Sequence, residues 1–236
     1  MINKSPLRYP GGKSRACNII DNILTKNFDI NFFDTILSPF FGGGSFEIFL
    51  SNKYNKQIIA NDKFTPLYNF WNQAKNNKQI LVEQIQSLST VTKLNFDEYR
   101  NNIVNLNNDS LLQATYYFII NRCSFSGATL SGGFSKEAAI TRFNKASIDR
   151  ISKLYLSNFS FYNLDCVEFI NNNYNERTFM FLDPPYYLEN KSKLYGLNGD
   201  MHETFNHEIL CQTLSTKSNW LLTYNNCDFI KNLYKN

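Results

Sequence analysis

Residues 34–45 read Asp34-Thr-Ile-Leu-Ser-Pro-Phe-Phe-Gly-Gly-Gly-Ser45, a short apolar run followed closely by three glycines. This order predicts a buried strand, a glycine turn and then a helix that begins near Ser45. Another short strand is expected in Gln57-Ile-Ile-Ala-Asn-Asp62, which ends in an acid. Two strands about 20 residues apart with a helix between them form a βαβ unit, so the sequence predicts an α/β fold with a parallel sheet.

Three more strands are expected later in the chain, in residues 159–165, 178–183 and 219–224. The first two of these end in Asp165 and Asp183. Ligands of an open parallel sheet bind in the crevice beyond the carboxyl ends of its strands. We therefore expect the acids at these strand ends to line one pocket.

The chain between the second and third expected strands has a different pattern. Helical stretches are expected at Pro66 to Leu88 and at Leu111 to Asn121, followed by a Gly/Ser-rich segment, residues 124–135, that we interpret as a flexible loop. This part is predicted to be an inserted lobe. The expected division is one domain of residues 1–63 and 160–236 and a lobe of residues 64–159.

The 236-residue chain is 43% hydrophobic and 16% aromatic, which suffices for one good core and a smaller lobe. No apolar run approaches the roughly 20 residues needed to cross a bilayer, so no membrane segment or signal peptide is indicated, and a cytoplasmic location is expected. The five cysteines are widely separated without a Cys-x-x-Cys pair and are read as reduced thiols. His202 and His207 are five residues apart, so no metal site is expected.

The net charge of +4 is unevenly distributed. Residues 1–20 carry four basic residues and no acid, and residues 117–153 carry six basic residues against Glu137 and Asp149. Such local patches suit a partner that bears phosphates, although solvated helix faces give the same pattern. The basic residues of the second stretch are Arg122, Lys136, Arg142, Lys145, Arg150 and Lys153.

The glycines after the first strand and the acids after later strands each have two interpretations. Glycines 42–44 allow a backbone to approach a ligand closely, but a plain tight turn is the commoner explanation of such a run. Asp62 is placed like the acid that binds ribose hydroxyls in dinucleotide folds, but an ordinary helix cap has the same pattern, and Asp165 has the same two readings. Residues 9–14 lack the glycine spacing and the preceding strand of a triphosphate-binding loop.

Leu182-Asp-Pro-Pro-Tyr186 is the most specific feature of the sequence. Two prolines directly after a buried strand fix an extended turn and remove two amide donors. The corner then offers the Asp183 carboxylate and the Pro184 carbonyl as acceptors for one amino group, and Tyr186 as a stacking surface for a planar base. These groups suit the exocyclic amine of adenine, while a rigid proline turn is the structural alternative.

With these motifs in this order, the chain resembles the Dam-like, adenine-specific DNA methyltransferases, in which the cofactor motifs precede the catalytic motif. The resemblance implies a Rossmann-like sheet that uses S-adenosylmethionine, with the inserted, mainly helical lobe recognising the target in double-stranded DNA. The matching segments are Leu7-Arg-Tyr-Pro-Gly-Gly-Lys13, Ser38-Pro-Phe-Phe-Gly-Gly-Gly-Ser45, Asn61-Asp62, Asn121-Arg122, Asn163-Leu-Asp165 and Asp183-Pro-Pro-Tyr186.

The resemblance also implies roles for individual residues. The base would be held by Asp183, Pro184 and Tyr186, and phosphates and base edges in the DNA by Arg122, Lys136, Arg142 and Lys145. Asp62 would bind the ribose, Asp165 the adenine of the cofactor, and the glycine turn its methionine part. The full set expected in the cofactor site is Tyr9, Lys13, Phe40, Gly42, Gly44, Asp62, Asp165 and Asp183.

The sequence departs from the family pattern at two places. Ser38 stands where the family usually has an acid that helps to hold the charged end of the cofactor, and the chain stops at Asn236, where the family continues into a β-hairpin. The expected C-terminal hairpin would then be missing. A restriction endonuclease is expected only as a genetic partner, and the protein is expected to be a monomer or a weak dimer.

Two alternative functions remain at this point. A related enzyme could methylate a base in RNA or a glutamine in a protein, although the motif associated with those substrates begins with Asn rather than Asp183. A non-catalytic DNA-binding relative is the other alternative, which Ser38 and the early stop support and which Asp62, Lys13 and Asp183 oppose.

Overall fold

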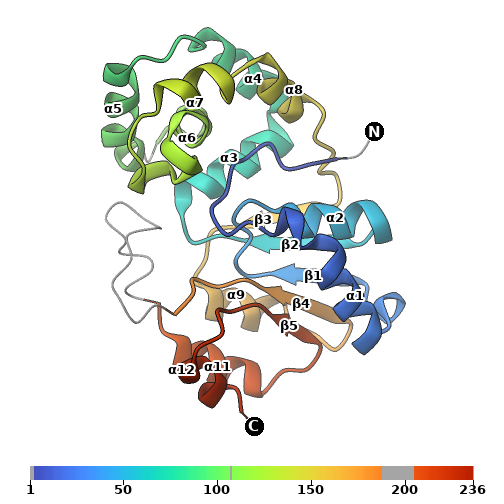
Figure 1. The fold of residues 1–236 in the computed structure, drawn as a ribbon. Coiled ribbons are helices and arrows are strands. Elements are labelled where there is room, and N and C mark those ends of the chain that lie inside the picture. The colour runs from blue at the N-terminus through green and yellow to red at the C-terminus, as the bar shows by residue number, and fades with distance from the viewer. Residues whose placement is uncertain (1–2, 107, 188–204, 236) are drawn as a thin grey trace.

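The computed structural model describes residues 3–106, 108–187 and 205–235. This part of the chain forms an α/β fold with a five-stranded sheet in the order β3-β2-β1-β4-β5, every neighbouring pair being parallel (Figure 1). The α/β, Rossmann-like prediction is therefore confirmed. The strands are β1 (Thr35–Ser38), β2 (Gln57–Asn61), β3 (Phe159–Tyr162), β4 (Thr178–Leu182) and β5 (Trp220–Leu222).

The inner strand β4, between β1 and β5, is buried along its whole length and divides its side chains between two apolar layers. Phe179 and Phe181 pack into the larger cluster on one face, whereas Met180 and Leu182 pack into a smaller cluster on the other. Burial on both faces explains why the central strands are continuous apolar runs rather than alternating ones.

Helices cover both faces of the sheet (Figure 1). The larger cluster includes side chains of α1 and α2, and the smaller one includes side chains of α9 and α11. The helices associated with the sheet are α1 (Cys17–Asn27), α2 (Ser45–Tyr54), α9 (Cys166–Asn173), α11 (His207–Ser215) and α12 (Asp228–Leu233). Short 3-10 turns are found at Lys13–Arg15, Ile30–Phe32, Ile103–Asn105, Phe125–Gly127 and Thr129–Ser131.

Six helices between β2 and β3 form the lobe that lies above the sheet in Figure 1. The helical stretch expected at 66–88 is two helices, because Asn77 leaves helical geometry between them. The lobe helices are α3 (Thr65–Asn76), α4 (Lys78–Ser87), α5 (Lys93–Asn102), α6 (Ser110–Cys123), α7 (Lys136–Thr141) and α8 (Lys145–Ser152).

The lobe shares its core with the sheet. Trp71 of α3 lies edge-to-face against Phe41 at 5.0 Å between ring centroids and stacks with Phe161 of β3. Its indole N–H also donates to the carbonyl of Gly42 at 2.9 Å. One apolar cluster therefore runs from the sheet through α3 into the lobe, and this attachment fixes the lobe relative to the glycine turn.

The Gly/Ser-rich segment is folded rather than the flexible loop that its composition suggests. Ser124 and Phe134 form an isolated antiparallel bridge, and the Phe125 N–H donates to the Gly133 carbonyl at 2.9 Å. Within it, Gly127 has a φ of 75° and lies so close to Arg8 that an added Cβ would be 2.7 Å from the Arg8 Cβ. The segment is therefore packed against the N-terminal segment of the chain at Arg8.

None of the helices in the described part of the chain combines the length and the apolar character needed to cross a membrane. The five cysteines are free thiols. Over the same described residues, no cluster of three His, Cys, Asp or Glu side chains could hold a metal ion. His202 lies outside the described residues, and the Nδ1 of His207 is 2.6 Å from the Tyr224 hydroxyl.

Candidate active site

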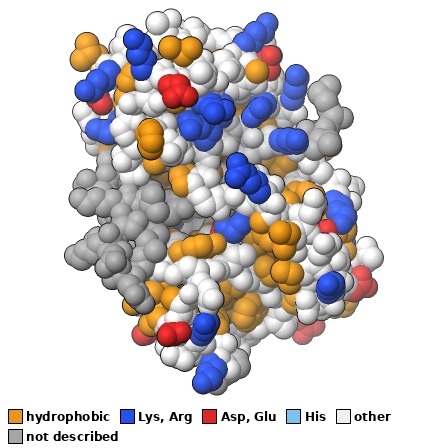
Figure 2. Space-filling view, in the orientation of Figure 1, with side chains coloured by type: hydrophobic (Ala, Val, Ile, Leu, Met, Phe, Trp, Pro, Cys, Tyr) orange, Lys and Arg blue, Asp and Glu red, His pale blue; other side chains and the backbone are white. Residues whose placement is uncertain are grey.

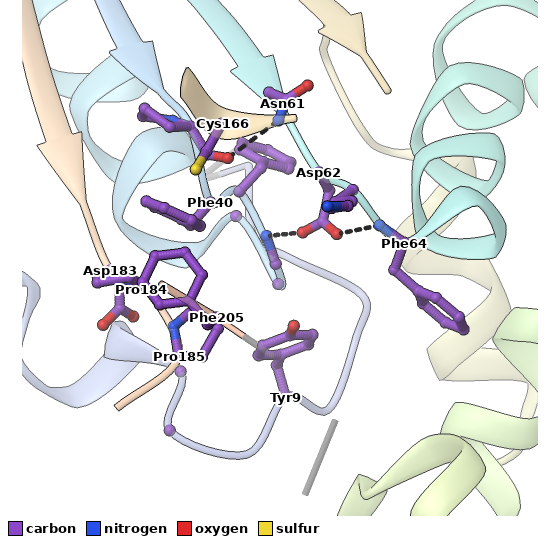
Figure 3. Close-up of a pocket in the computed structure, with 18 of the residues that line it drawn as sticks. Tyr9, Phe40, Asn61, Asp62, Phe64, Cys166, Asp183, Pro184, Pro185 and Phe205 are labelled. Carbon is purple, nitrogen blue, oxygen red and sulfur yellow. Dashed lines mark hydrogen bonds between the residues drawn. The ribbon is translucent and has the colours of Figure 1, made fainter. Parts of the chain in front are cut away.

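A cavity of about 440 Å³ opens at the carboxyl ends of β1, β2 and β4 (Figure 3). The chain order reverses between β1 and β4, the position where open α/β sheets bind their ligands. Figure 3 shows Asp62 and Asp183 on opposite sides of the cavity, with Phe40 and Tyr9 also lining it. All the residues that the sequence assigned to the cofactor and the base line this one cavity.

The glycine turn is the tight turn that the sequence offered as one of its two interpretations. Gly44 donates to the Phe41 carbonyl at 2.8 Å, which closes a tight turn, and both Gly42 and Gly44 have positive φ. The close approach is made by Tyr9, because a Cβ added to Gly43 would lie 2.7 Å from the Tyr9 Cβ. The turn thus holds the N-terminal segment against the cavity.

Asp62 follows β2 and accepts two backbone hydrogen bonds, from Gly42 N at 2.9 Å and from Phe64 N at 3.0 Å. It therefore fixes the glycine turn and the entry to α3 together. Burial raises the pKa of Asp62 to about 6, although these two donors oppose the shift. The neighbouring Asn61 ties the ends of the strands, donating to the Pro39 and Leu164 carbonyls and accepting from Leu164 N.

Asp165 is the N-cap of α9, accepting from Val167 N at 3.0 Å, so the helix-cap interpretation is correct for this residue. Its other oxygen pairs with Lys63 at 3.0 Å. Burial would raise the pKa of Asp165, but the Lys63 and Val167 hydrogen bonds outweigh it and the pKa is lowered. Asp165 is thus an ionised, half-exposed acid at the rim of the cavity.

Asp183 is held from two sides. Lys13 pairs with Oδ2 at 2.5 Å, and the Thr223 hydroxyl donates to Oδ1 at 2.7 Å. Burial lowers the pKa of Lys13, but the charge and hydrogen bond of Asp183 outweigh it and the pKa is raised. The Lys13 ammonium also lies 5.2 Å from the ring centre of Tyr186. Pro184, which follows Asp183, is buried.

Ser38 and Glu47 form a buried pair at the floor of the site. The Ser38 hydroxyl, fully buried at the end of β1, donates to Glu47 Oε1 at 2.6 Å. Glu47 is 3% exposed and lines the cavity from the first turn of α2. Burial raises its pKa to about 7, against the opposing effect of the Ser38 hydrogen bond.

The four basic residues expected to contact DNA do not share one environment. Arg122 is only 6% exposed, and its guanidinium donates to the carbonyls of Arg142 and Pro6. Its role is to fasten the N-terminal segment to the lobe, which corrects the expectation that it reads DNA. Lys136, Arg142 and Lys145 are exposed on the lobe, where Figure 2 shows Lys and Arg side chains gathered.

Several residues of the site were not predicted from the sequence. Thr223 and Lys63 act through hydrogen bonds to Asp183 and Asp165, which lie in other segments of the chain, and no local pattern marks them. Glu47 did carry a signal. In the sequence it is the one charged residue of Phe46-Glu-Ile-Phe-Leu50, an apolar run that predicts a buried position, and the structure buries Phe46, Ile48 and Leu50 around it.

The fold and the site together define a Rossmann-like α/β methyltransferase. The family model of the D12 class N6 adenine-specific DNA methyltransferases matches residues 9–236, and the chain belongs to this family. It is an adenine-specific DNA methyltransferase. Among curated proteins, it is 24% identical over 209 residues to the type II methyltransferase M.MjaIII of Methanocaldococcus jannaschii, an alignment that covers 80% of this chain and 71% of that protein. The non-catalytic alternative is thereby disfavoured.

Proposed function

We propose that the protein transfers a methyl group from S-adenosylmethionine to the exocyclic amino nitrogen of an adenine turned out of duplex DNA. The observation that carries this proposal is the single cavity lined by Asp62, Asp165, Glu47 and the Asp183–Tyr186 corner. Its volume of about 440 Å³ is in the range of cofactor sites. Family membership supports the methyl donor and the base.

The residues present fit the cofactor. Asp62, at one wall of the cavity, is placed to accept from ribose hydroxyls, and Asp165 at the rim is placed to meet an adenine edge. Phe40 and the glycine turn offer an apolar and backbone surface for the part between them. When bound, S-adenosylmethionine supplies an electrophilic methyl group on a positively charged sulfur.

The target amino group has two acceptors in this proposal, the Asp183 carboxylate and the Pro184 carbonyl, and the ring of Tyr186 stacks on the base. Accepting both amino hydrogens orients the nitrogen lone pair toward the methyl group. Methyl transfer would break the methyl–sulfur bond and leave S-adenosylhomocysteine. The target nitrogen would become acidic only once methylated and could then lose its proton by way of the Asp183 carboxylate to solvent, so Asp183 need not be a strong base. Turning the base out costs a few kcal/mol, which protein contacts offset.

Lys13 has a further part in this step. Its ammonium occupies Oδ2 of Asp183 and lies near the Tyr186 ring, both of which the base must use. Lys13 must therefore share or release Oδ2 as the base enters, while Thr223 continues to hold Oδ1. The lobe of residues 64–159 is proposed to recognise the target, with Lys136, Arg142 and Lys145 contacting phosphates or base edges.

Incubation with labelled S-adenosylmethionine and a panel of duplex DNAs, followed by mapping of methylated adenines, tests the proposal. Asp183→Ala should lower methyl transfer by about 100-fold or more while leaving cofactor binding measurable by calorimetry. The matched control is Asp228→Ala, since the Asp228 side chain is 95% exposed. Undiminished turnover in Asp183→Ala would refute the assignment, and single-stranded RNA as the better substrate would refute the choice of nucleic acid.

A further inference from the structure

The charges in the cavity are unevenly paired. Asp183 has Lys13 and Asp165 has Lys63 as cationic partners. Glu47 and Asp62 have no Lys or Arg partner within the described residues, and burial raises the pKa of both. Two of the four acids that line the site therefore have no directly paired Lys or Arg in the part of the protein that the structure describes.

Asp62 has backbone partners in two other segments that explain its presence, whereas Glu47, among the described residues, accepts only from the Ser38 hydroxyl and from its own backbone N–H. Asp62 accepts from two N–H groups that shape the turn and the start of α3. The hydrogen bond of Glu47 with another side chain comes from the Ser38 hydroxyl, for which an amide oxygen would serve equally well as acceptor. A carboxylate therefore occupies a position where the fold itself needs only a hydrogen-bond acceptor.

Its place in a helix does not explain Glu47 either. An acid in the first turn complements the helix dipole, and Glu168 in the first turn of α9 has this role at an exposed position. Glu47 occupies the same first-turn position of α2 but is almost fully buried. Burying a carboxylate without a paired cation is costly, so the negative charge of Glu47 does not stabilise the ligand-free fold. A cationic group bound in the cavity would offset that cost.

We propose that Glu47, oriented by the Ser38 hydroxyl, is the ligand for the α-ammonium group at the amino-acid end of the cofactor. The inference rests on the proposed use of S-adenosylmethionine. It assigns the cavity from end to end: Asp62 takes the ribose hydroxyls, Glu47 takes the cation, and Asp183 remains with the target base. Ser38 is a positioning residue for the Glu47 carboxylate.

Calorimetry with two nucleosides separates this role from a structural one. S-adenosylhomocysteine carries the ammonium, whereas 5′-methylthioadenosine has the same adenosine and thioether but no amino-acid end. In Glu47→Gln, the Kd for S-adenosylhomocysteine should rise about 10- to 100-fold, the usual effect of losing a charge-assisted hydrogen bond. The Kd for 5′-methylthioadenosine should stay within about twofold. Glu168→Gln, the matched exposed first-turn variant, should change neither.

The dependence of binding on pH gives a second readout. Only ionised Glu47 attracts the ammonium, so affinity for S-adenosylhomocysteine should rise as the pH increases through about 7, the raised pKa of Glu47. The charged groups that act on Glu47 are Lys13 of the N-terminal segment and Asp183 after β4, and the Cys17 thiol of α1 stays neutral because its pKa is raised. Asp62 titrates near 6, and 5′-methylthioadenosine reports its contribution separately.

The outcomes are distinct. Loss of the pH dependence near 7 in Glu47→Gln, together with an upward shift of that midpoint in Ser38→Ala, would support the inference. Equal weakening of both nucleosides in Glu47→Gln, or unchanged binding of S-adenosylhomocysteine, would overturn it while leaving the proposed function intact. A wild-type protein that binds neither nucleoside would overturn the proposed function and this inference together.

Discussion

Replacing Glu47 with Gln should stabilise the ligand-free protein at pH 8. Burial moves the pKa of Glu47 from its ordinary value of 4.5 to about 7. At about 1.4 kcal/mol for each pH unit, ionised Glu47 therefore costs the folded state at most about 3 kcal/mol. Gln keeps an oxygen that can accept from the Ser38 hydroxyl but adds an amide donor in a buried place, so we expect a net gain of about 1–3 kcal/mol.

The difference in the free energy of unfolding between Glu47→Gln and wild type depends on pH within a defined range. A carboxyl group with a raised pKa in the folded state contributes no penalty below pH 4.5, where it is protonated in both states. The penalty grows as the pH rises from 4.5 and is complete above about 7, the folded-state pKa of Glu47. The advantage of Glu47→Gln over wild type should therefore be largest at pH 8 and fall toward zero near pH 4.5.

Urea unfolding at pH 5 and pH 8, followed by circular dichroism without ligand, measures the effect, with Glu168→Gln as the exposed first-turn control. Adding S-adenosylhomocysteine at 100 times its wild-type Kd should then stabilise wild type by about 2.7 kcal/mol, but a variant with a tenfold higher Kd by only about 1.4 kcal/mol. A Glu47→Gln protein that is less stable than wild type by the same amount at both pH values would refute the reasoning, because that result describes a carboxylate needed by the fold.

Three other substitutions test the remaining assignments. Arg122→Ala should lower the free energy of unfolding by about 3 kcal/mol, because it leaves buried carbonyls without donors, and an unchanged urea midpoint would contradict its structural role. Lys145→Ala should change stability by less than about 0.5 kcal/mol but reduce the slope of log affinity against log salt for duplex DNA by about 1, and an unchanged slope would remove it from the DNA surface. Gly43→Ala should cost about 1–3 kcal/mol and weaken nucleoside binding, because its Cβ would lie 2.7 Å from that of Tyr9; wild-type stability would show that this contact can shift freely.

The part of the site that lies at strand ends could be predicted from the sequence. A parallel sheet brings the carboxyl ends of its strands to one edge, so Asp62, Asp165 and Asp183 were expected at one pocket and do line it. The five strands lie where the apolar runs predicted them, and β4 is buried on both faces, but β3 and β5 are shorter than the expected residues 159–165 and 219–224. These inferences need only local patterns and the general geometry of parallel sheets.

Contacts between segments distant in sequence could not be predicted in this way. Arg122 belongs to a basic stretch by composition, yet its guanidinium bonds to Pro6, 116 positions away, and to the carbonyl of Arg142. Charge counting treats such a buried arginine and an exposed Lys145 alike. The Gly/Ser-rich segment was misjudged for the same reason, because its packing against Arg8 depends on the N-terminal segment crossing the lobe.

Ser38 shows how a local departure from a family pattern can be offset elsewhere in the chain. Judged alone, a hydroxyl in place of an acid removes a charge from the end of β1. The structure places the carboxylate of Glu47, nine positions later, within 2.6 Å of that hydroxyl. The negative charge is therefore still at the floor of the cavity, supplied by a helix instead of a strand. Lys13 and Lys63 pair with Asp183 and Asp165. Apart from Asp62, Glu47 is therefore the described carboxylate of the cavity that has no directly paired cation and can meet a positively charged ligand end.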